Sequence, residues 1–128
     1  MRELDAGINK LTQRVIKAAI EVHRHLGPGF LESVYEEAMC SELELQSISF
    51  ERQVPISINY KGKSLGDGRL DLVVDKKLIV ELKAVANLAP IHTAQLLSYL
   101  KTTGHQLGLL INFNVPMLKE GIKRVVLT

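Results

Sequence analysis

Three ionisable side chains lie within otherwise apolar sequence near the middle of this chain. Asp71 belongs to the apolar segment 70–74. Glu81 and Lys83 belong to a second apolar segment, 78–85, which follows a short polar turn. Two segments rich in Val, Ile and Leu that a few polar residues join predict an antiparallel hairpin. Because alternate side chains of a strand share a face, Glu81 and Lys83 point the same way, and the hairpin can bring Asp71 beside them.

Two carboxylates and an amine in a mostly buried sheet allow two interpretations. Burying an ion costs several kcal/mol unless the ion is paired or binds a metal. Two neighbouring carboxylates repel each other, and a divalent ion that prefers oxygen ligands, such as Mg²⁺ or Mn²⁺, removes that repulsion. The alternative is a structural salt bridge in which Lys83 neutralises Glu81 or Asp71. The hairpin alone does not decide between them.

Two helices are predicted before the hairpin. Apolar residues recur every three or four positions over residues 8–26, which is the pattern of an amphipathic helix. A second helix is predicted to begin after Gly29 and to end near Gln46, and Glu32 lies in its first turn, where the helix dipole favours a carboxylate. Because Glu32 borders the inner stripe, it can also point toward the sheet. The predicted inner stripe consists of Leu31, Val34, Tyr35, Ala38 and Met39.

The remaining segments complete a mixed sheet. Alternating apolar residues predict a strand over 48–60, a turn at 60–63, and a next strand from about Ser64 that meets a glycine-rich kink at 66–68. After the hairpin, Asn87 is the expected cap of a helix that ends at Gly104. Two further strands are predicted at 106–113, apolar enough to be buried on both faces, and at 122–127.

Gln95 and Tyr99 lie four residues apart on the helix before Gly104, so they share one face. Polar side chains on a helix that is apolar nearly all round suggest groups directed into a site. The alternative is that Tyr99 packs with its hydroxyl at the rim of the core and that Gln95 is exposed.

The composition sets the class of protein. With 128 residues and 46% hydrophobic content, residues 1–128 are expected to form one domain. The 16 basic and 14 acidic residues give a formal charge of +2, which permits a nucleic-acid partner without requiring one. The single cysteine, Cys40, excludes an internal disulfide and fits a reducing cytoplasm. No apolar segment has membrane-spanning length, so we expect a cytoplasmic protein without a membrane partner.

The order of these groups resembles a known family pattern. An acid in a helix, an Asp, a Glu-x-Lys on the adjacent strand and a Gln-x-x-x-Tyr on the following helix resemble the PD-(D/E)XK nuclease superfamily, the last element being typical of its RecB-like branch. The closest resemblance is to the small GxxExxR family, over the segments 29–35, 81–85, 94–100 and 108–113. It implies an α/β (mixed α+β) fold, a restriction-endonuclease-like core whose mixed central sheet is flanked by helices in the order ααβββαββ.

The resemblance also implies roles for the residues. Asp71 and Glu81 would hold Mg²⁺ or Mn²⁺ together with the backbone carbonyl of Leu82, and Glu32 would bind directly or through water. Lys83 would orient the attacking water or stabilise developing charge. Gln95 and Tyr99 would position the phosphate or Lys83. The cations that could follow a nucleic-acid backbone are Arg52, Lys61, Lys63, Lys101, Lys123 and Arg124.

Two residues depart from the family patterns. Leu70 precedes Asp71 where the superfamily name has Pro, and Tyr35 stands where the GxxExxR name has Arg.

The function that the resemblance implies is hydrolysis of phosphodiester bonds in nucleic acid, with DNA the expected substrate. The alternative is a catalytically silent module on the same fold that binds nucleic acid or assembles with protein. A homodimer is compatible with this size, because one small domain offers little surface for duplex DNA.

Overall fold

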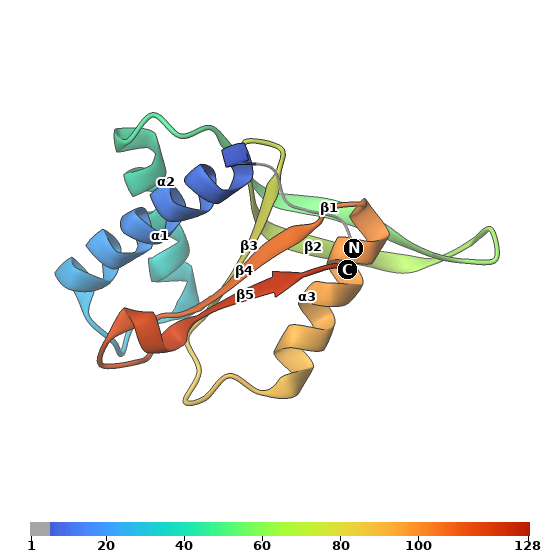
Figure 1. Ribbon diagram of the computed structural model, residues 1–128. Coiled ribbons are helices and arrows are strands. Elements are labelled where there is room, and N and C mark those ends of the chain that lie inside the picture. Colours follow the sequence, from blue (N-terminus) through green and yellow to red (C-terminus); the bar gives the residue numbers. More distant parts are fainter. Residues whose placement is uncertain (1–5) are drawn as a thin grey trace.

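The computed structural model describes residues 6–128 and shows one sheet with helices on both faces (Figure 1). The predicted order of two helices, three strands, a helix and two strands is confirmed, and a short 3-10 helix before the last strand is added. The elements are α1 (Ala6–Leu26), α2 (Glu32–Leu45), β1 (Phe50–Tyr60), β2 (Lys63–Val74), β3 (Leu78–Lys83), α3 (Pro90–Thr103), β4 (Leu107–Asn112), η1 (Leu118–Gly121) and β5 (Ile122–Val126).

The strands follow one another across the sheet in chain order, β1-β2-β3-β4-β5. β3 and β4 are parallel, and the other neighbours are antiparallel. A parallel pair needs a crossover connection, which α3 supplies between β3 and β4. The predicted hairpin is confirmed, because β2 and β3 pair from Val74 and Leu78 onward. The mixed α/β fold is therefore the one that the sequence indicated.

Each face of the sheet has its own core. α1 and α2 cover one face, whose buried residues include Val15, Ala18, Tyr35, Met39, Leu72, Val80, Leu109 and Phe113. α3 covers the other, whose buried residues are Leu70, Val73, Ile79, Leu96, Leu100, Leu110 and Val125. All six residues of β4 are buried, as predicted for a strand that is covered on both faces. No helix within residues 6–128 combines the length and the apolar content needed to cross a membrane.

The predicted inner face of α2 is partly wrong. Leu31 is 75% exposed and Val34 is 36% exposed. The helix begins at Glu32, so Leu31 precedes it in an extended conformation and does not share its periodicity. The buried stripe begins one turn later and contains Tyr35, Met39 and Leu43. The helix therefore packs on the sheet through Tyr35, Met39 and Leu43 and not through Leu31 or Val34.

Both ends of α3 are defined by local geometry. The predicted cap Asn87 is wrong, because the cap is Ala89, whose N–H donates to Nδ1 of His92 over 2.9 Å. Asn87 lies too early because Pro90 fixes the first helical residue. Gly104 ends the helix with a φ of 77°, a left-handed conformation that glycine adopts without strain.

β1 and β2 continue beyond the core as a two-stranded arm, defined here as residues 55–69 (Figure 1). Every residue from 57 to 67 is exposed. The predicted turn is confirmed, and Lys61 and Gly62 both have positive φ, as a two-residue hairpin turn requires. β1 begins at Phe50, two residues later than predicted. The predicted kink at 66–68 does not interrupt β2, although the pairing register shifts between Ile58 and Asn59.

A candidate metal centre where β2 and β3 separate

The site begins where the pairing of β2 with β3 stops. Leu72 and Val80 form the last pair of this ladder. Beyond it, the N–H of Leu82 donates to Oδ2 of Asp71 over 2.8 Å. The side chain of Asp71 thus takes the place that a carbonyl of β2 would occupy in a continued ladder. A carboxylate that accepts a backbone N–H is held in a fixed position beside β3.

The backbone of β2 is irregular at Asp71. Leu70 packs in the core under α3, whereas Leu72 packs in the core under α1 and α2. Residues two apart in a regular strand would lie on the same face. On the neighbouring strand β1, Gln53 has a φ of 51° and has no partner in the β1–β2 register. This break in alternation lets the carboxylate of Asp71 reach along the sheet to β3.

Glu81 is a buried acid that lacks a complete set of partners. Its side chain is 6% exposed, and Oε1 has no hydrogen-bond partner. The pKa of Glu81 is raised to about 9, chiefly by burial and then by the charge of Asp71 and a hydrogen bond to it, whereas the charge of Lys83 opposes the shift. A buried carboxylate oxygen without a partner is costly. Glu81 therefore requires a proton or a cation at this position.

Lys83 does not neutralise either acid by direct contact. Within residues 6–128, the ion pairs closer than 4 Å join Glu21 to Arg24 and His25, and Arg52 to Glu36 and Glu37. The charge of Lys83 nevertheless lowers the pKa of both Glu81 and Glu32, which places the amine near both carboxyls. The structural salt bridge considered from the sequence is thus not formed.

Glu32 approaches the site from the first turn of α2. Burial raises its pKa, the negative charge of Asp71 raises it further, and Lys83 opposes the shift. Glu32 is exposed, and these interactions indicate that its carboxylate lies in the neighbourhood of Asp71 and Lys83. That Glu32 itself points toward the sheet stays a prediction.

Tyr99 reaches the same site from α3. Burial raises the pKa of Tyr99, the charges of Glu81 and Asp71 raise it further, and a hydrogen bond from Gln95 opposes the shift. The ring lies against the backbone of Gly68, where Cε1 of Tyr99 would be 3.5 Å from an added Cβ. Gln95 is exposed, which agrees with the alternative interpretation of the sequence, but its side chain forms a hydrogen bond with the Tyr99 hydroxyl.

The donor set fits a hard divalent ion with waters. Within residues 6–128 no three His, Cys, Asp or Glu side chains lie close enough together to hold an ion alone. Mg²⁺ usually binds through one or two carboxylates and retains several waters. Asp71 and the unpartnered oxygen of Glu81 supply two carboxylates. The carbonyl of Leu82 lies on the same side of β3 as the N–H that Asp71 accepts, because both groups of a strand residue face the same neighbour.

Tyr35 supports Glu32, a role that sequence reasoning missed. Its hydroxyl donates to the carbonyl of Gly27 over 2.6 Å and accepts from the N–H of Phe30 over 3.2 Å. Its ring stacks on Phe113 at 4.6 Å between centroids. Tyr35 therefore fixes the loop that leads into α2. The glycines of that loop, together with the Tyr at the position where the GxxExxR name has Arg, were the signal in the sequence that could have indicated this role.

We expect Tyr35→Phe to lower the free energy of unfolding by about 1 kcal/mol, because two partly buried hydrogen bonds to the backbone are lost while the ring stacking remains. Urea unfolding measures this change. Tyr60→Phe is the matched control, since Tyr60 is 58% exposed and should leave stability unchanged within about 0.5 kcal/mol. Equal effects of the two substitutions would contradict the anchoring role.

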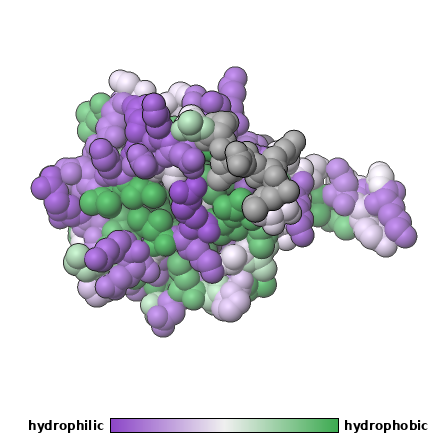
Figure 2. All heavy atoms as spheres, in the orientation of Figure 1, coloured by the Kyte–Doolittle hydropathy of each residue, from purple (hydrophilic) through white to green (hydrophobic). Residues whose placement is uncertain are grey.

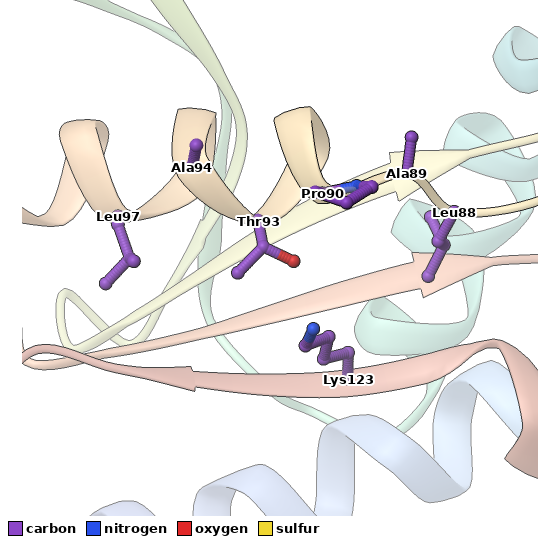
Figure 3. A pocket seen from close by; sticks show the side chains of 7 residues that line it. All are labelled: Leu88, Ala89, Pro90, Thr93, Ala94, Leu97 and Lys123. Atoms are coloured by element: carbon purple, nitrogen blue, oxygen red, sulfur yellow. The ribbon is translucent and has the colours of Figure 1, made fainter.

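The six candidate nucleic-acid cations are in different environments. Arg52 donates to Glu36 and Glu37 over 2.7 Å each, so its charge is already balanced. Lys61 and Lys63 stand at the tip of the arm, and Lys101 lies in the last turn of α3. Arg124 donates to Asn9 on α1. Lys123 lines a pocket of about 420 Å³ with Leu88, Ala89, Pro90, Thr93, Ala94 and Leu97 (Figure 3).

That pocket lies between the N-terminal half of α3 and β5, and it shares no residue with the acidic site. The candidate centre is instead built from the first turn of α2, the break in β2, the end of β3 and the inner side of α3. One acid from a helix, two acids and a lysine from adjacent strands, and a supporting tyrosine define a nuclease-like α/β domain.

A model of the PD-(D/E)XK nuclease superfamily matches residues 9–125, and the chain belongs to that superfamily. Membership indicates a nuclease-like function with nucleic acid as the substrate, and nucleases of this superfamily generally depend on a divalent metal. No curated protein and no solved structure matches the chain at a significant level.

Proposed function

We propose that this protein is a metal-dependent nuclease that hydrolyses phosphodiester bonds of DNA with Mg²⁺ or Mn²⁺. The observation that carries the proposal is the buried Oε1 of Glu81, which has no hydrogen-bond partner and lies beside Asp71. A structural role would require this oxygen to be satisfied within the protein. A divalent ion satisfies it and also offsets the repulsion between the two acids.

Each residue has a distinct role in the proposed reaction. Asp71, Glu81 and the carbonyl of Leu82 would hold the ion, and Glu32 would bind one of its waters. A bound divalent ion lowers the pKa of water and stabilises negative charge on a phosphate. Lys83 keeps an ammonium near the acids without pairing to them, so it can orient the attacking water or neutralise charge that develops on the phosphate.

Gln95 and Tyr99 act on the groups that bind the ion. The hydroxyl of Tyr99 can donate to a carboxylate or to a phosphate oxygen, and Gln95 holds that hydroxyl in place. The hydrogen bond between Gln95 and Tyr99 supports our proposal that they form the Gln-x-x-x-Tyr element of the RecB-like branch and that the chain is a GxxExxR protein. Leu70 in place of Pro leaves the carboxylate of Asp71 unchanged, and Tyr35 in place of Arg supplies a loop anchor.

One observation favours a second candidate. Because no three acidic, His or Cys side chains cluster tightly within residues 6–128, the centre depends on water and a backbone carbonyl for its remaining ligands. A catalytically silent module that binds nucleic acid or protein would tolerate such an incomplete set. This silent module predicts binding of nucleic acid or protein without cleavage.

We further propose that residues 1–128 form one domain that acts in the cytoplasm, where the buried Cys40 stays reduced.

Incubation of the protein with single- and double-stranded DNA in Mg²⁺, Mn²⁺ or EDTA tests the proposal. We expect cleavage in either metal and none in EDTA. Lys83→Met should lower the cleavage rate by about 10²-fold, because one charge-stabilising group is lost. The same variant should keep Mn²⁺ affinity by calorimetry, since Lys83 is not a ligand. Cleavage at the wild-type rate in this variant would identify a contaminant or a different site.

A further inference from the structure

The arm is a feature that the metal centre does not use. From Ser57 to Asp67 its residues are exposed on both faces (Figure 2 shows it at the right, hydrophilic at its far end). A two-stranded ribbon in water is marginally stable on its own, so its extension beyond the core needs a functional reason. Ile58, Tyr60 and Leu65 are 39%, 58% and 59% exposed on it.

The arm carries the excess positive charge of the protein. The chain has 16 basic and 14 acidic residues, and the arm contributes three basic residues (Lys61, Lys63 and Arg69) and one acidic residue (Asp67). The rest of the chain therefore has 13 residues of each sign. None of these arm cations forms an ion pair within residues 6–128. Such an isolated positive element attracts a polyanion.

The arm is also thin. Gly66 pairs with Ile58, and Gly68 pairs with Ile56, so one strand lacks side chains on the face that the isoleucines share. Nothing lies within 4 Å of the position where a Cβ of Gly66 would be. Glycine in a strand allows another backbone to approach closely. At the tip, Tyr60 pairs with Lys63, and Lys61 lies 5.3 Å from the centroid of the Tyr60 ring.

We propose that the arm is the duplex-DNA-binding element of the proposed nuclease and enters the major groove with Lys61 and Lys63 at its tip. This inference rests on the proposed function and adds the substrate form and the means of its recognition. The major groove of B-form DNA is about 12 Å wide and admits a two-stranded ribbon. The major groove of A-form RNA is deep and too narrow for side chains to read. The arm therefore selects duplex DNA over duplex RNA.

The arm fixes a distance from the reaction centre. β2 leads directly from the tip to Asp71, about nine residues away, which spans roughly 30 Å at ~3.3 Å per residue. Duplex DNA advances ~3.4 Å per base pair, so the tip contacts the substrate at most about nine base pairs from the cleaved bond. Substrates that are shorter than this on one side lose the contribution of the arm.

A second copy of the chain fits the arm less well. A symmetric contact between two arms would bring Lys61 and Lys63 of both copies together, and their charges repel. The eleven exposed residues from 57 to 67 fall short of the ~20 residues per partner of a stable interface, and three of them, Ile58, Tyr60 and Leu65, are large and apolar. Charge and area together favour nucleic acid over self-association.

Fluorescence anisotropy of wild-type protein in EDTA, with a 24-base-pair DNA duplex and the matched RNA duplex, tests the inference without requiring cleavage. We expect DNA to bind at least about 10-fold more tightly than RNA. Lys61→Gln with Lys63→Gln should weaken DNA binding about 10-fold and lower the salt slope by about 2, because each phosphate contact contributes about one unit. Replacing residues 57–67 with an Asn-Gly turn should weaken it at least as much.

Lys76→Gln with Lys77→Gln is the matched control. It removes the same charge from the turn at the opposite end of β2, where Lys76 shares the positive φ of Lys61. We expect this control to change affinity less than twofold. Equal weakening by the two lysine pairs, equal binding of DNA and RNA, or conversion of a dimer to a monomer in the shortened variant without loss of DNA affinity would overturn the inference. Binding as expected without cleavage in Mg²⁺ would refute only the nuclease proposal.

Discussion

Asp71→Asn is expected to abolish both Mn²⁺ binding and DNA cleavage while leaving the fold intact. The amide oxygen of asparagine can still accept the N–H of Leu82, so the break in β2 keeps its hydrogen bond. The lost negative charge removes one of two carboxylate ligands. Loss of the ion removes several kcal/mol of transition-state stabilisation, which corresponds to at least about a 10³-fold slower reaction.

Calorimetric titration with Mn²⁺ and a single-turnover cleavage assay measure the two effects of this substitution. Asp75→Asn is the matched control, because it removes the same charge from the exposed turn at the end of β2 and should change neither quantity. If Asp71→Asn retained Mn²⁺ binding, the ion would not lie between β2 and β3, and the proposed centre would be wrong.

Glu81→Gln is expected to stabilise the metal-free protein at pH 8 and to eliminate activity. The pKa of Glu81 is raised to about 9 in the folded protein from its ordinary value of 4.5. Between these values the folded state binds a proton that the unfolded state does not, so wild-type stability falls as the pH rises. Glutamine is neutral throughout, and the variant lacks this loss. The gain at pH 8 should be a few kcal/mol, or about 5–10 °C in melting temperature.

Thermal unfolding in EDTA at pH 5 and at pH 8 measures this difference. The two proteins should unfold at similar temperatures at pH 5, where Glu81 is protonated, and should diverge at pH 8. Adding Mn²⁺ at pH 8 should stabilise the wild type alone and release protons, because the ion binds the ionised carboxylate. A variant that is less stable than wild type at pH 8 in EDTA would show that Glu81 has protein partners that satisfy its charge.

The hairpin and the proximity of Asp71 to Glu81 were predictable because they depend on local patterns. A polar turn between two apolar segments sets the register, and alternation places Glu81 and Lys83 on one face. The bond from Leu82 to Asp71 was not predictable in this way. It depends on where the β2–β3 ladder ends and on the irregularity opposite Gln53, and both are results of packing on two faces of the sheet.

The sequence also could not predict that the arm is uncovered or that Tyr35 anchors the loop before Glu32. Alternation over Val54, Ile56, Ile58 and Tyr60 is the same whether a strand is covered or not. The part of the β1–β2 ribbon that α3 covers ends where Tyr99 lies against Gly68, and this contact is tertiary. Likewise, Tyr35 was recognised as a core residue, but its hydroxyl bonds to the preceding loop required the geometry of that loop.

β5 is an edge strand, since within residues 6–128 its one strand neighbour is β4. An open edge is a template onto which another extended chain can add. Lys123 and Arg124 are exposed on this strand, one beside the pocket under α3 and the other bonded to Asn9 on α1. An incoming strand would have to dehydrate both cations. Charged side chains on an edge strand disfavour such an addition, so we expect Lys123 and Arg124 to oppose edge-to-edge aggregation whether or not DNA or metal is bound.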